Sequence, residues 1–185
     1  MAFEKLRNIF LSGDSEAFDK GIKELEGSFS FDTIPKMNLK FVNESNNEDP
    51  TYAKDGDAGF DLRANIGENP IFMGAGDMMI IPTGLFFEIP TGFEIQIRSR
   101  SGLAAKHGVA VLNSPGTIDS GYRGEIKVIL INHGKKDFYV NHGDRIAQAV
   151  YASVLASHIV ELEQVDEILD STERGTTGFG SSGVK

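Results

Sequence analysis

Short stretches of alternating apolar and polar residues, each closed by a turn signal, dominate the chain from residue 37 onward. The alternation is clearest over residues 93–98 and 125–131, and it is also present over residues 37–42 and 80–89. Gly, Pro and Asn residues separate these stretches, as they do between consecutive strands. Each such strand buries only one of its faces and therefore needs a second layer to cover it. The pattern predicts an all-β domain, a jelly-roll-like sandwich or barrel of short strands.

The first 35 residues follow a different pattern. Phe18, Ile22 and Leu25 recur at i, i+4 and i+7, and the residues before them also show helical spacing. The sequence therefore predicts a short α-helical extension over residues 1–35, a β domain over residues 36–170 and a flexible tail over residues 171–185. The extension carries no catalytic chemistry. It is expected to pack on the body or on a neighbouring subunit, or to bind a protein partner.

Charge and cysteine content exclude several functions. The chain has 18 Lys and Arg residues and 27 Asp and Glu residues, and its formal net charge is −9. This charge argues against a protein that binds long nucleic acid. The chain has no cysteine, and this excludes a thiolate nucleophile and a zinc–thiolate site. No apolar run reaches the ~20 residues of a membrane span. We expect a soluble, cytoplasmic protein without membrane contact.

Two arginines, two serines and a glycine follow one another at the end of the strand over residues 93–98. Arg98, Ser99, Arg100, Ser101 and Gly102 supply guanidinium donors, hydroxyls and an approachable backbone, which together suit a phosphate group. An alternative is a pair of solvated arginines beside a tight turn.

A glycine-bounded hairpin over residues 116–125 contains one carboxylate, Asp119, with Tyr122 three residues later. A carboxylate held near a bound phosphate can deprotonate a water molecule, and a tyrosine ring can pack flat on a sugar. An alternative is an ordinary hairpin turn with a surface aspartate.

Two further segments have less specific chemistry. Asp55, Asp57 and Asp61 alternate along the chain, and carboxylates so placed can hold Mg²⁺, often through its water ligands. A calcium loop is not expected, because Ile66 stands where an EF-hand has its glutamate. Residues 143–148 form a charged turn before a strand, from which Gln148 can reach across.

The last twelve residues are rich in glycine and hydroxyl groups. Such a segment cannot bury a core and is expected to be mobile when free. Arg174 supplies a fixed positive charge and Phe179 an aromatic ring, so the tail could order over a nucleotide. A disordered tail without function is the alternative.

Five stretches, residues 57–62, 98–103, 116–125, 143–148 and 174–183, resemble in their order the five motifs of the homotrimeric dUTPase family. The resemblance covers about residues 37–183. It implies a jelly-roll homotrimer whose active sites lie between subunits and draw on all three chains. The implied reaction is hydrolysis of dUTP to dUMP and pyrophosphate with Mg²⁺, which lowers dUTP and supplies dUMP for dTMP synthesis.

The resemblance also implies a role for each matching residue. Asp119 is the general base that directs water to the α-phosphate, Tyr122 stacks on the deoxyribose, and Asp61 holds magnesium waters from the second shell of a metal chelated by the triphosphate. The other implied substrate-binding residues are Arg100, Ser101, Gly102 and Gln148 at the phosphates, Asn113, Gly116, Thr117, Ile118 and Lys127 at uracil, and Arg174, Phe179, Gly180, Ser181 and Ser182 in the tail.

Two rival functions remain open from the sequence. A dCTP deaminase shares the implied fold, but it would need a glutamate to activate water at the cytosine ring, whereas this chain offers Asp119 and a phosphate-binding tail. A dUTP-gated interaction protein would use nucleotide binding as a switch, and residues 1–35 are the feature that favours it.

Overall fold

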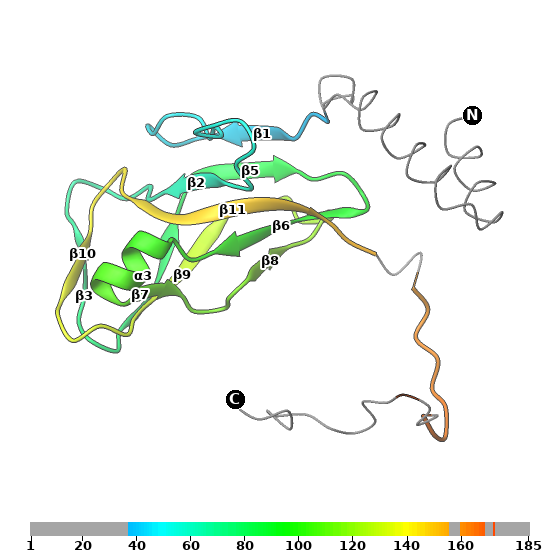
Figure 1. Ribbon diagram of the computed structural model, residues 1–185. Coiled ribbons are helices and arrows are strands. Elements are labelled where there is room, and N and C mark those ends of the chain that lie inside the picture. The colour runs from blue at the N-terminus through cyan, green and yellow to red at the C-terminus, as the bar shows by residue number, and fades with distance from the viewer. Residues whose placement is uncertain (1–36, 156–159, 169–171, 173–185) are drawn as a thin grey trace, which may run out of the picture. The chain divides into compact units, whose positions relative to one another are not determined.

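The computed structural model describes residues 37–155, 160–168 and 172 (Figure 1). The helices predicted over residues 1–35 lie outside this range, and so does the predicted tail apart from Thr172. The chain divides into two units, Met1–Leu39 and Lys40–Lys185. The described part of the second unit consists of strands with one short helix, which confirms the predicted all-β class.

The elements follow closely from the alternating stretches. β6 spans Phe93–Arg98, as predicted, and the described residues contain one helix, α3, Ser101–His107. The strand predicted to begin at residue 125 begins at Lys127, because Glu125 and Ile126 bond instead to the loop before β5. The remaining strands are β1 Lys40–Asn43, β2 Phe60–Arg63, β3 Ile71–Met73, β4 Met78–Pro82, β5 Leu85–Glu88, β7 Val109–Val111, β8 Gly116–Ile118, β9 Lys127–Asn132, β10 Phe138–Val140 and β11 Arg145–Ser153.

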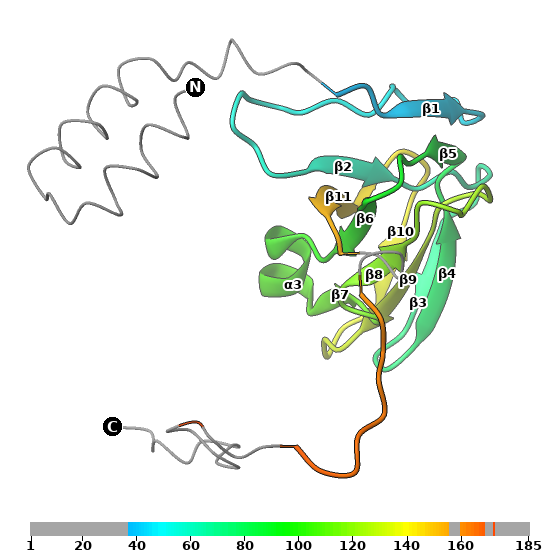
Figure 2. The same cartoon turned by 90° about the vertical axis from the view of Figure 1, so that its right-hand side faces the viewer.

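Two sheets supply most of the core. The larger has the strand order β2-β11-β6-β8 and the smaller the order β4-β9-β7, and all neighbouring strands run antiparallel. In Figure 2, β11 and β6 lie on one side of the domain and β3 and β4 on the other. Leu62 and Ile95 from the larger sheet are fully buried, as are Val128 and Leu130 from the smaller. Two short pairs, β1-β5 and β3-β10, complete the strands.

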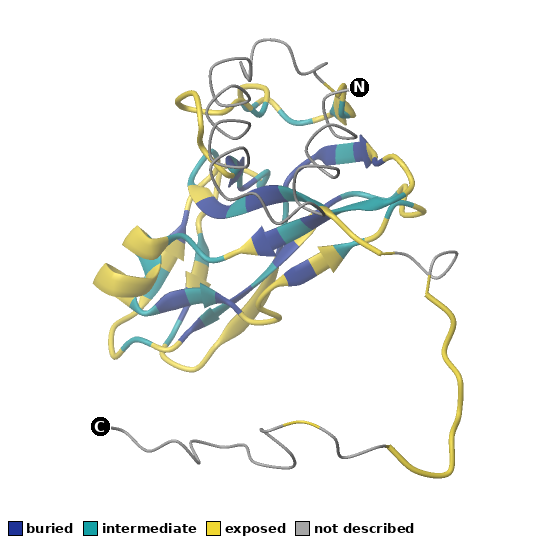
Figure 3. Ribbon diagram, turned by 45° about the vertical axis from the view of Figure 1, so that its right-hand side comes forward, coloured by how far each residue is buried: buried dark blue, intermediate teal, exposed yellow. Residues whose placement is uncertain are grey.

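Burial follows the strands and leaves the helix outside (Figure 3). Every second residue of β9 is buried, whereas α3 has no buried residue. Helix α3 is thus a surface element directly after β6, and the turn between them presents Ser99 and Arg100. No helix among the described residues is long and apolar enough to cross a membrane.

Candidate active site

A carboxylate and two guanidinium groups from three different elements meet at one point. Asp61 lies on β2, and its carboxylate accepts hydrogen bonds from Arg100 Nε at 2.8 Å and from Arg145 Nη1 at 3.3 Å. Arg100 Nη1 also donates to the Arg145 carbonyl at 3.1 Å. The Asp61 and Arg100 side chains are half-buried. The three side chains carry a net charge of +1 within an acidic protein, so the cluster suits an anion.

The sheet register explains why these residues meet. On β11, Gln148 is paired with Asp61 of β2 and with Arg98 of β6. The Gln148 side-chain amide donates to the Ser99 carbonyl at 2.9 Å, and the Ser99 hydroxyl accepts the Val111 N–H at 2.9 Å. These bonds fix the turn that carries Arg100 toward Asp61.

The structure therefore brings together three of the segments singled out in the sequence, residues 57–62, 98–103 and 143–148. Ser101 and Gly102 begin α3 beside the cluster and are exposed. Sequence reasoning placed Arg145 in the charged turn before a strand and did not identify it as a partner of Asp61. Arg98 does not join the cluster, because its guanidinium bonds to Gln96 Oε1.

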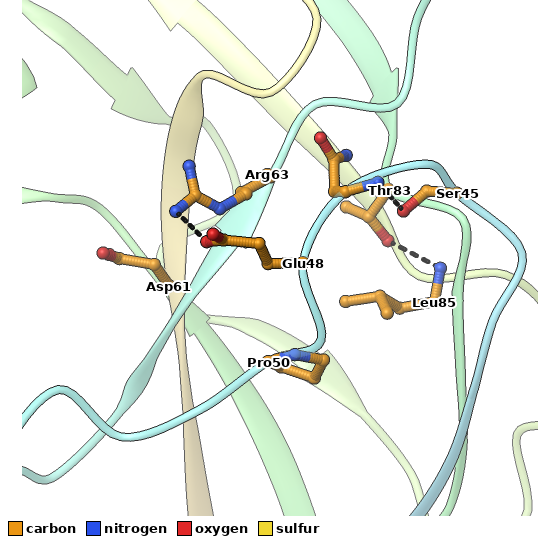
Figure 4. A pocket seen from close by; sticks show the side chains of 8 residues that line it. Ser45, Glu48, Pro50, Asp61, Arg63, Thr83 and Leu85 are labelled. Atoms are coloured by element: carbon orange, nitrogen blue, oxygen red, sulfur yellow. Dashed lines mark hydrogen bonds and ion pairs between the residues drawn. The ribbon is translucent and has the colours of Figure 1, made fainter.

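Open hollows flank the cluster on two sides. One of about 310 Å³ is lined by Arg100, Leu103, Phe138, Tyr139, Asp144, Arg145 and Ile146. Another of about 260 Å³ is lined by residues of the segment 51–61 together with Gln148. A third, water-sized space of about 10 Å³ adjoins Asp61 and Arg63, where Arg63 pairs with Glu48 (Figure 4). The two larger hollows have room for phosphate groups, and Asp119 lines neither of them.

The hairpin that carries Asp119 forms a second, separate group. β8 pairs with β6 on one side and is the edge of its sheet. Asp119 follows directly after β8 and is exposed. The Tyr122 hydroxyl donates to the Glu125 carbonyl at 3.0 Å, and the Tyr122 N–H donates to the Asp119 carbonyl at 3.0 Å. Tyr122 is 45% exposed and accessible to a ligand.

The residues expected at uracil lie around the same hairpin. Gly116 is buried, and the Asn113 side-chain amide lies 3.2 Å from the position that a Cβ at Gly116 would take. Thr117 pairs with Gln96 on β6. Lys127 is exposed at the start of β9, with its ammonium 3.5 Å from the Glu125 carboxylate. The hairpin is thus a unit with a free strand edge, an aromatic ring and a carboxylate.

The three alternating aspartates do not form a metal cage. The Asp57 carboxylate accepts the Lys54 N–H at 2.8 Å, and that of Asp61 is paired with two arginines. No group of three or more His, Cys, Asp or Glu side chains that could hold a metal ion occurs within residues 37–155, 160–168 and 172. A metal ion at this site would therefore need most of its ligands from the substrate.

Two residues with shifted pKa values lie outside the proposed site residues. A hydrogen bond from Lys40 and the charge of that residue lower the pKa of the exposed Glu88 carboxyl. Burial raises the pKa of Tyr151 on β11, whose ring stacks on Phe93 with centroids 4.8 Å apart. Neither residue belongs to the Asp61 cluster or to the hairpin of Asp119.

The predicted tail residues Arg174, Phe179, Gly180, Ser181 and Ser182 lie outside the described residues. What the described part defines is an all-β protein with a cationic cluster suited to phosphate and a separate exposed carboxylate. These groups are characteristic of an enzyme that hydrolyses a phosphate anhydride.

Comparison with known proteins specifies the class further. The dUTPase family model matches residues 45–183. The deoxyuridine 5'-triphosphate nucleotidohydrolase of Rhizobium etli is 48% identical over 155 residues, 83% of this chain and 97% of the relative. That of Caulobacter vibrioides is 52% identical over 136 residues, 73% of this chain and 85% of the relative. The chain belongs to the dUTPase family, and it is an enzyme that hydrolyses dUTP to dUMP and pyrophosphate.

The fold agrees with a solved member of the family. A mutant dUTPase of Staphylococcus bacteriophage 80alpha with dUpNHpp superposes with a TM-score of 0.70 at 25% identity, covering 80% of this chain and 100% of that one. The likeness confirms the predicted jelly-roll class of fold.

Proposed function

We propose that Asp119 is the general base of dUTP hydrolysis and that the Asp61–Arg100–Arg145 cluster binds the triphosphate. The observation that supports this assignment is that the two carboxylates differ in their hydrogen-bond and ion-pair partners. Asp61 is held by two guanidinium groups, whereas the Asp119 carboxylate has no hydrogen-bond or ion-pair partner among the described residues. An unpaired, exposed carboxylate has its lone pairs available to accept a proton from water.

In this mechanism, water attacks the α-phosphorus as Asp119 takes its proton. The bond from the α-phosphorus to the bridging oxygen breaks, and pyrophosphate leaves with that oxygen while dUMP keeps the new one. Arg100 and Arg145 stabilise charge on the phosphate chain, and Ser101, Gly102 and Gln148 donate further hydrogen bonds. The guanidinium groups are already fixed by Asp61, so little reorganisation accompanies the reaction.

The nucleoside would lie against the hairpin. β8 is an edge strand, so half of its backbone N–H and C=O groups point away from the sheet. The backbone groups around Thr117 and Ile118 that face this edge can thus offer a donor and an acceptor to the alternating edge of uracil, with Asn113 and Lys127 nearby. Cytosine carries an amine where uracil has an oxygen, and the same backbone groups would reject it. Tyr122 would stack on the deoxyribose and leave no room for a 2′-hydroxyl.

The Asp61 cluster can hold Mg²⁺ through the water ligands of the ion. The Asp61 carboxylate offers about four lone-pair positions, and two of them accept from arginine. The remaining two can accept hydrogen bonds from water ligands of Mg²⁺ that is itself chelated by the triphosphate. When bound, the ion would withdraw electron density from the phosphoryl oxygens.

The separation of the two groups supports an active site shared between copies of the chain. Three strand spacings separate β2 from β8, and three residues along β6 separate the row of Asp61 from that of Ile118. At ~4.8 Å per strand and ~3.4 Å per residue, the Cα atoms of Asp61 and Ile118 are about 18 Å apart. The free edge of β8 also points away from β2. A nucleotide on the hairpin would therefore meet the phosphate cluster of another subunit.

An apolar surface provides the contact that such an assembly needs. The outward face of the β4-β9-β7 sheet is mostly apolar, with Met78, Ile80, Ala110, Ile129 and Ile131, and Lys127 lies at one end of it beside Pro82; Leu112 directly after β7 adds to the apolar residues. Met78 and Ile80 are each 63% exposed. Exposed apolar patches of this kind mark protein contacts, and we propose that this apolar sheet face joins three copies into the homotrimer. The tail, with Arg174 at the γ-phosphate and Phe179 over uracil, would then close the site.

The decisive experiment replaces the proposed base. Asp119→Asn keeps the size of the side chain but removes its ability to accept a proton, so turnover of dUTP should fall by about 10²- to 10⁴-fold. Binding of dUpNHpp should be unchanged, because the phosphate cluster and the hairpin backbone remain. Pyrophosphate release and calorimetric titration measure the two quantities. Normal turnover in this variant would show that Asp119 is not the base.

The alternative function, a dUTP-gated interaction protein, is tested by deletion of the N-terminal extension. Deleting residues 1–35 should leave dUTP turnover intact if this segment recruits a partner, whereas loss of the trimer would give it a structural role. A dCTP deaminase activity has no support from the family to which the chain belongs.

A further inference from the structure

The loop between β4 and β5, residues 83 and 84 with the strand residues Pro82 and Leu85 on either side, is held by hydrogen bonds from two directions. The Pro82 carbonyl accepts the Asn65 N–H at 2.8 Å, and the Gly84 carbonyl accepts the Glu44 N–H at 2.8 Å. Gly84 has a φ of +69°, and a Cβ there would lie 2.8 Å from both the Asn65 amide and the Ser45 Cβ. Only glycine fits at this position, so the loop is a rigid point of the fold.

The same loop is hydrogen-bonded to the end of the hairpin, residues 125 and 126. Thr83 is 1% exposed, and its hydroxyl donates to the Ile126 carbonyl at 2.7 Å while accepting the Leu85 N–H at 3.2 Å. Figure 4 shows the Thr83 hydroxyl directed at Leu85. The Gly84 N–H donates to Glu125 Oε1 at 2.9 Å, and the Ile126 N–H donates to the Leu85 carbonyl at 2.8 Å. These hydrogen bonds fix residues 125 and 126 on the loop.

The contacts continue from there to the proposed site. The Glu125 carbonyl accepts the Tyr122 hydroxyl, and the Asp119 carbonyl accepts the Tyr122 N–H, both at 3.0 Å. The return arm of the hairpin, residues 119–126, has no strand of its own. Its position therefore depends on β8 at one end and on the anchored residues 125 and 126 at the other, so a shift at Glu125 would move Tyr122 and, through its hydrogen bond, Asp119.

We propose that Thr83 is a positioning residue for dUTP hydrolysis, acting through Glu125 and Ile126 on Tyr122 and Asp119. The inference rests on the proposed roles of Asp119 and Tyr122. A buried hydroxyl is needed at residue 83 because it must donate to one backbone group and accept from another. A valine of the same shape does neither and leaves both groups unpaired.

The test compares Thr83→Val with Thr83→Ser in the full chain. Thr83→Val should lower kcat for dUTP by about ten- to a hundredfold, because displacing a reacting group by about 1 Å costs up to ~10² in rate. The KM should stay within about threefold, because the hydrogen bonds of the Thr83 hydroxyl go to Ile126 and Leu85 and not to Asp61, Arg100 or Arg145. Thr83→Ser keeps the hydroxyl and should retain most of the activity.

A matched control separates positioning from stability. Asn132 is also fully buried and holds a turn, donating to the Met73 and Lys136 carbonyls and accepting the Gly134 N–H. Asn132→Ala should lower the melting temperature as Thr83→Val does, but leave kcat unchanged. Hydrogen exchange of residues 119–126 should accelerate in Thr83→Val and not in Asn132→Ala, and this readout is independent of activity.

The kcat of Thr83→Val and its hydrogen exchange at residues 119–126 decide whether Thr83 is a positioning residue. Unchanged kcat and unchanged exchange at residues 119–126 in folded Thr83→Val would overturn the proposal. If that variant does not fold, Glu125→Ala replaces it, with Glu125→Gln as the variant that keeps the acceptor, and equal activity of the two would also count against the anchor. Full activity of Asp119→Asn would instead refute the proposed base, while the exchange result would still report on the anchor.

Discussion

Replacing Gly124 by alanine should weaken the discrimination between dUTP and UTP. A Cβ at residue 124 would overlap the Tyr122 hydroxyl and lie 2.6 Å from the ring carbon that bears it. Carbon atoms in contact prefer about 3.5–4.0 Å, so the ring must move by roughly 1 Å. The hydrogen bond from the Tyr122 hydroxyl to the Glu125 carbonyl would be lost or distorted by the same movement.

The expected magnitude follows from that displacement. A shift of about 1 Å in a positioned group costs up to ~10² in rate, so kcat/KM for dUTP should fall about ten- to a hundredfold, or about 1.4–2.7 kcal/mol in the transition state. UTP should lose less, because the displaced Tyr122 ring no longer excludes the 2′-hydroxyl. The ratio of the two kcat/KM values should therefore fall about tenfold.

A pyrophosphate-release assay with each nucleotide measures this ratio. Gly121→Ala is the matched control in the same hairpin, since a Cβ at residue 121 meets nothing within 4 Å. An unchanged ratio in Gly124→Ala, or an equal loss in Gly121→Ala, would refute the role given to Tyr122.

Two further predictions concern assembly and pH. Ile80→Lys places a charge on the apolar sheet face and should convert the proposed trimer into single chains in sedimentation. Activity should be lost as well, because the proposed site is shared between subunits. A trimer that persists would exclude this face as the contact. Burial raises the pKa of Tyr151 above the ordinary value of 10.0, so the folded state holds this proton more tightly than the unfolded chain. The stability from this group is complete below about pH 10 and is lost as the pH rises through the folded pKa. Tyr151→Phe should therefore reduce the fall of the melting temperature above pH 10, and an identical fall would contradict the assignment.

Local patterns were sufficient for much of the fold. The alternation over residues 93–98 gave β6 with its observed ends. Shorter strands such as β3, β7 and β10, with three residues each, carry too few residues for alternation to be recognised. Their existence depends on partners far away in the chain.

The candidate site was likewise predicted from the sequence only in part. The residue types at Arg100, Asp119 and Tyr122 indicated phosphate binding, a base and a sugar contact from the sequence. The pairing of Asp61 with Arg145 could not be predicted, because 84 residues separate them in the chain and only the β2-β11 register brings them together. Thr83 likewise had no sequence signal, since an isolated threonine between Pro82 and Gly84 is typical of a turn.

The strand-rich class, the kinds of chemical groups and the order of motifs that resembles the dUTPase family all follow from the order of amino acids. Chemistry resides in side chains and short segments, and these can be recognised locally. Which carboxylate is neutralised by arginine and which remains unpaired depends on the folded arrangement. The same arrangement places Asp61 and the hairpin of Asp119 at the two edge strands of one sheet, β2 and β8, because strand order and register are set by long-range pairing and core packing.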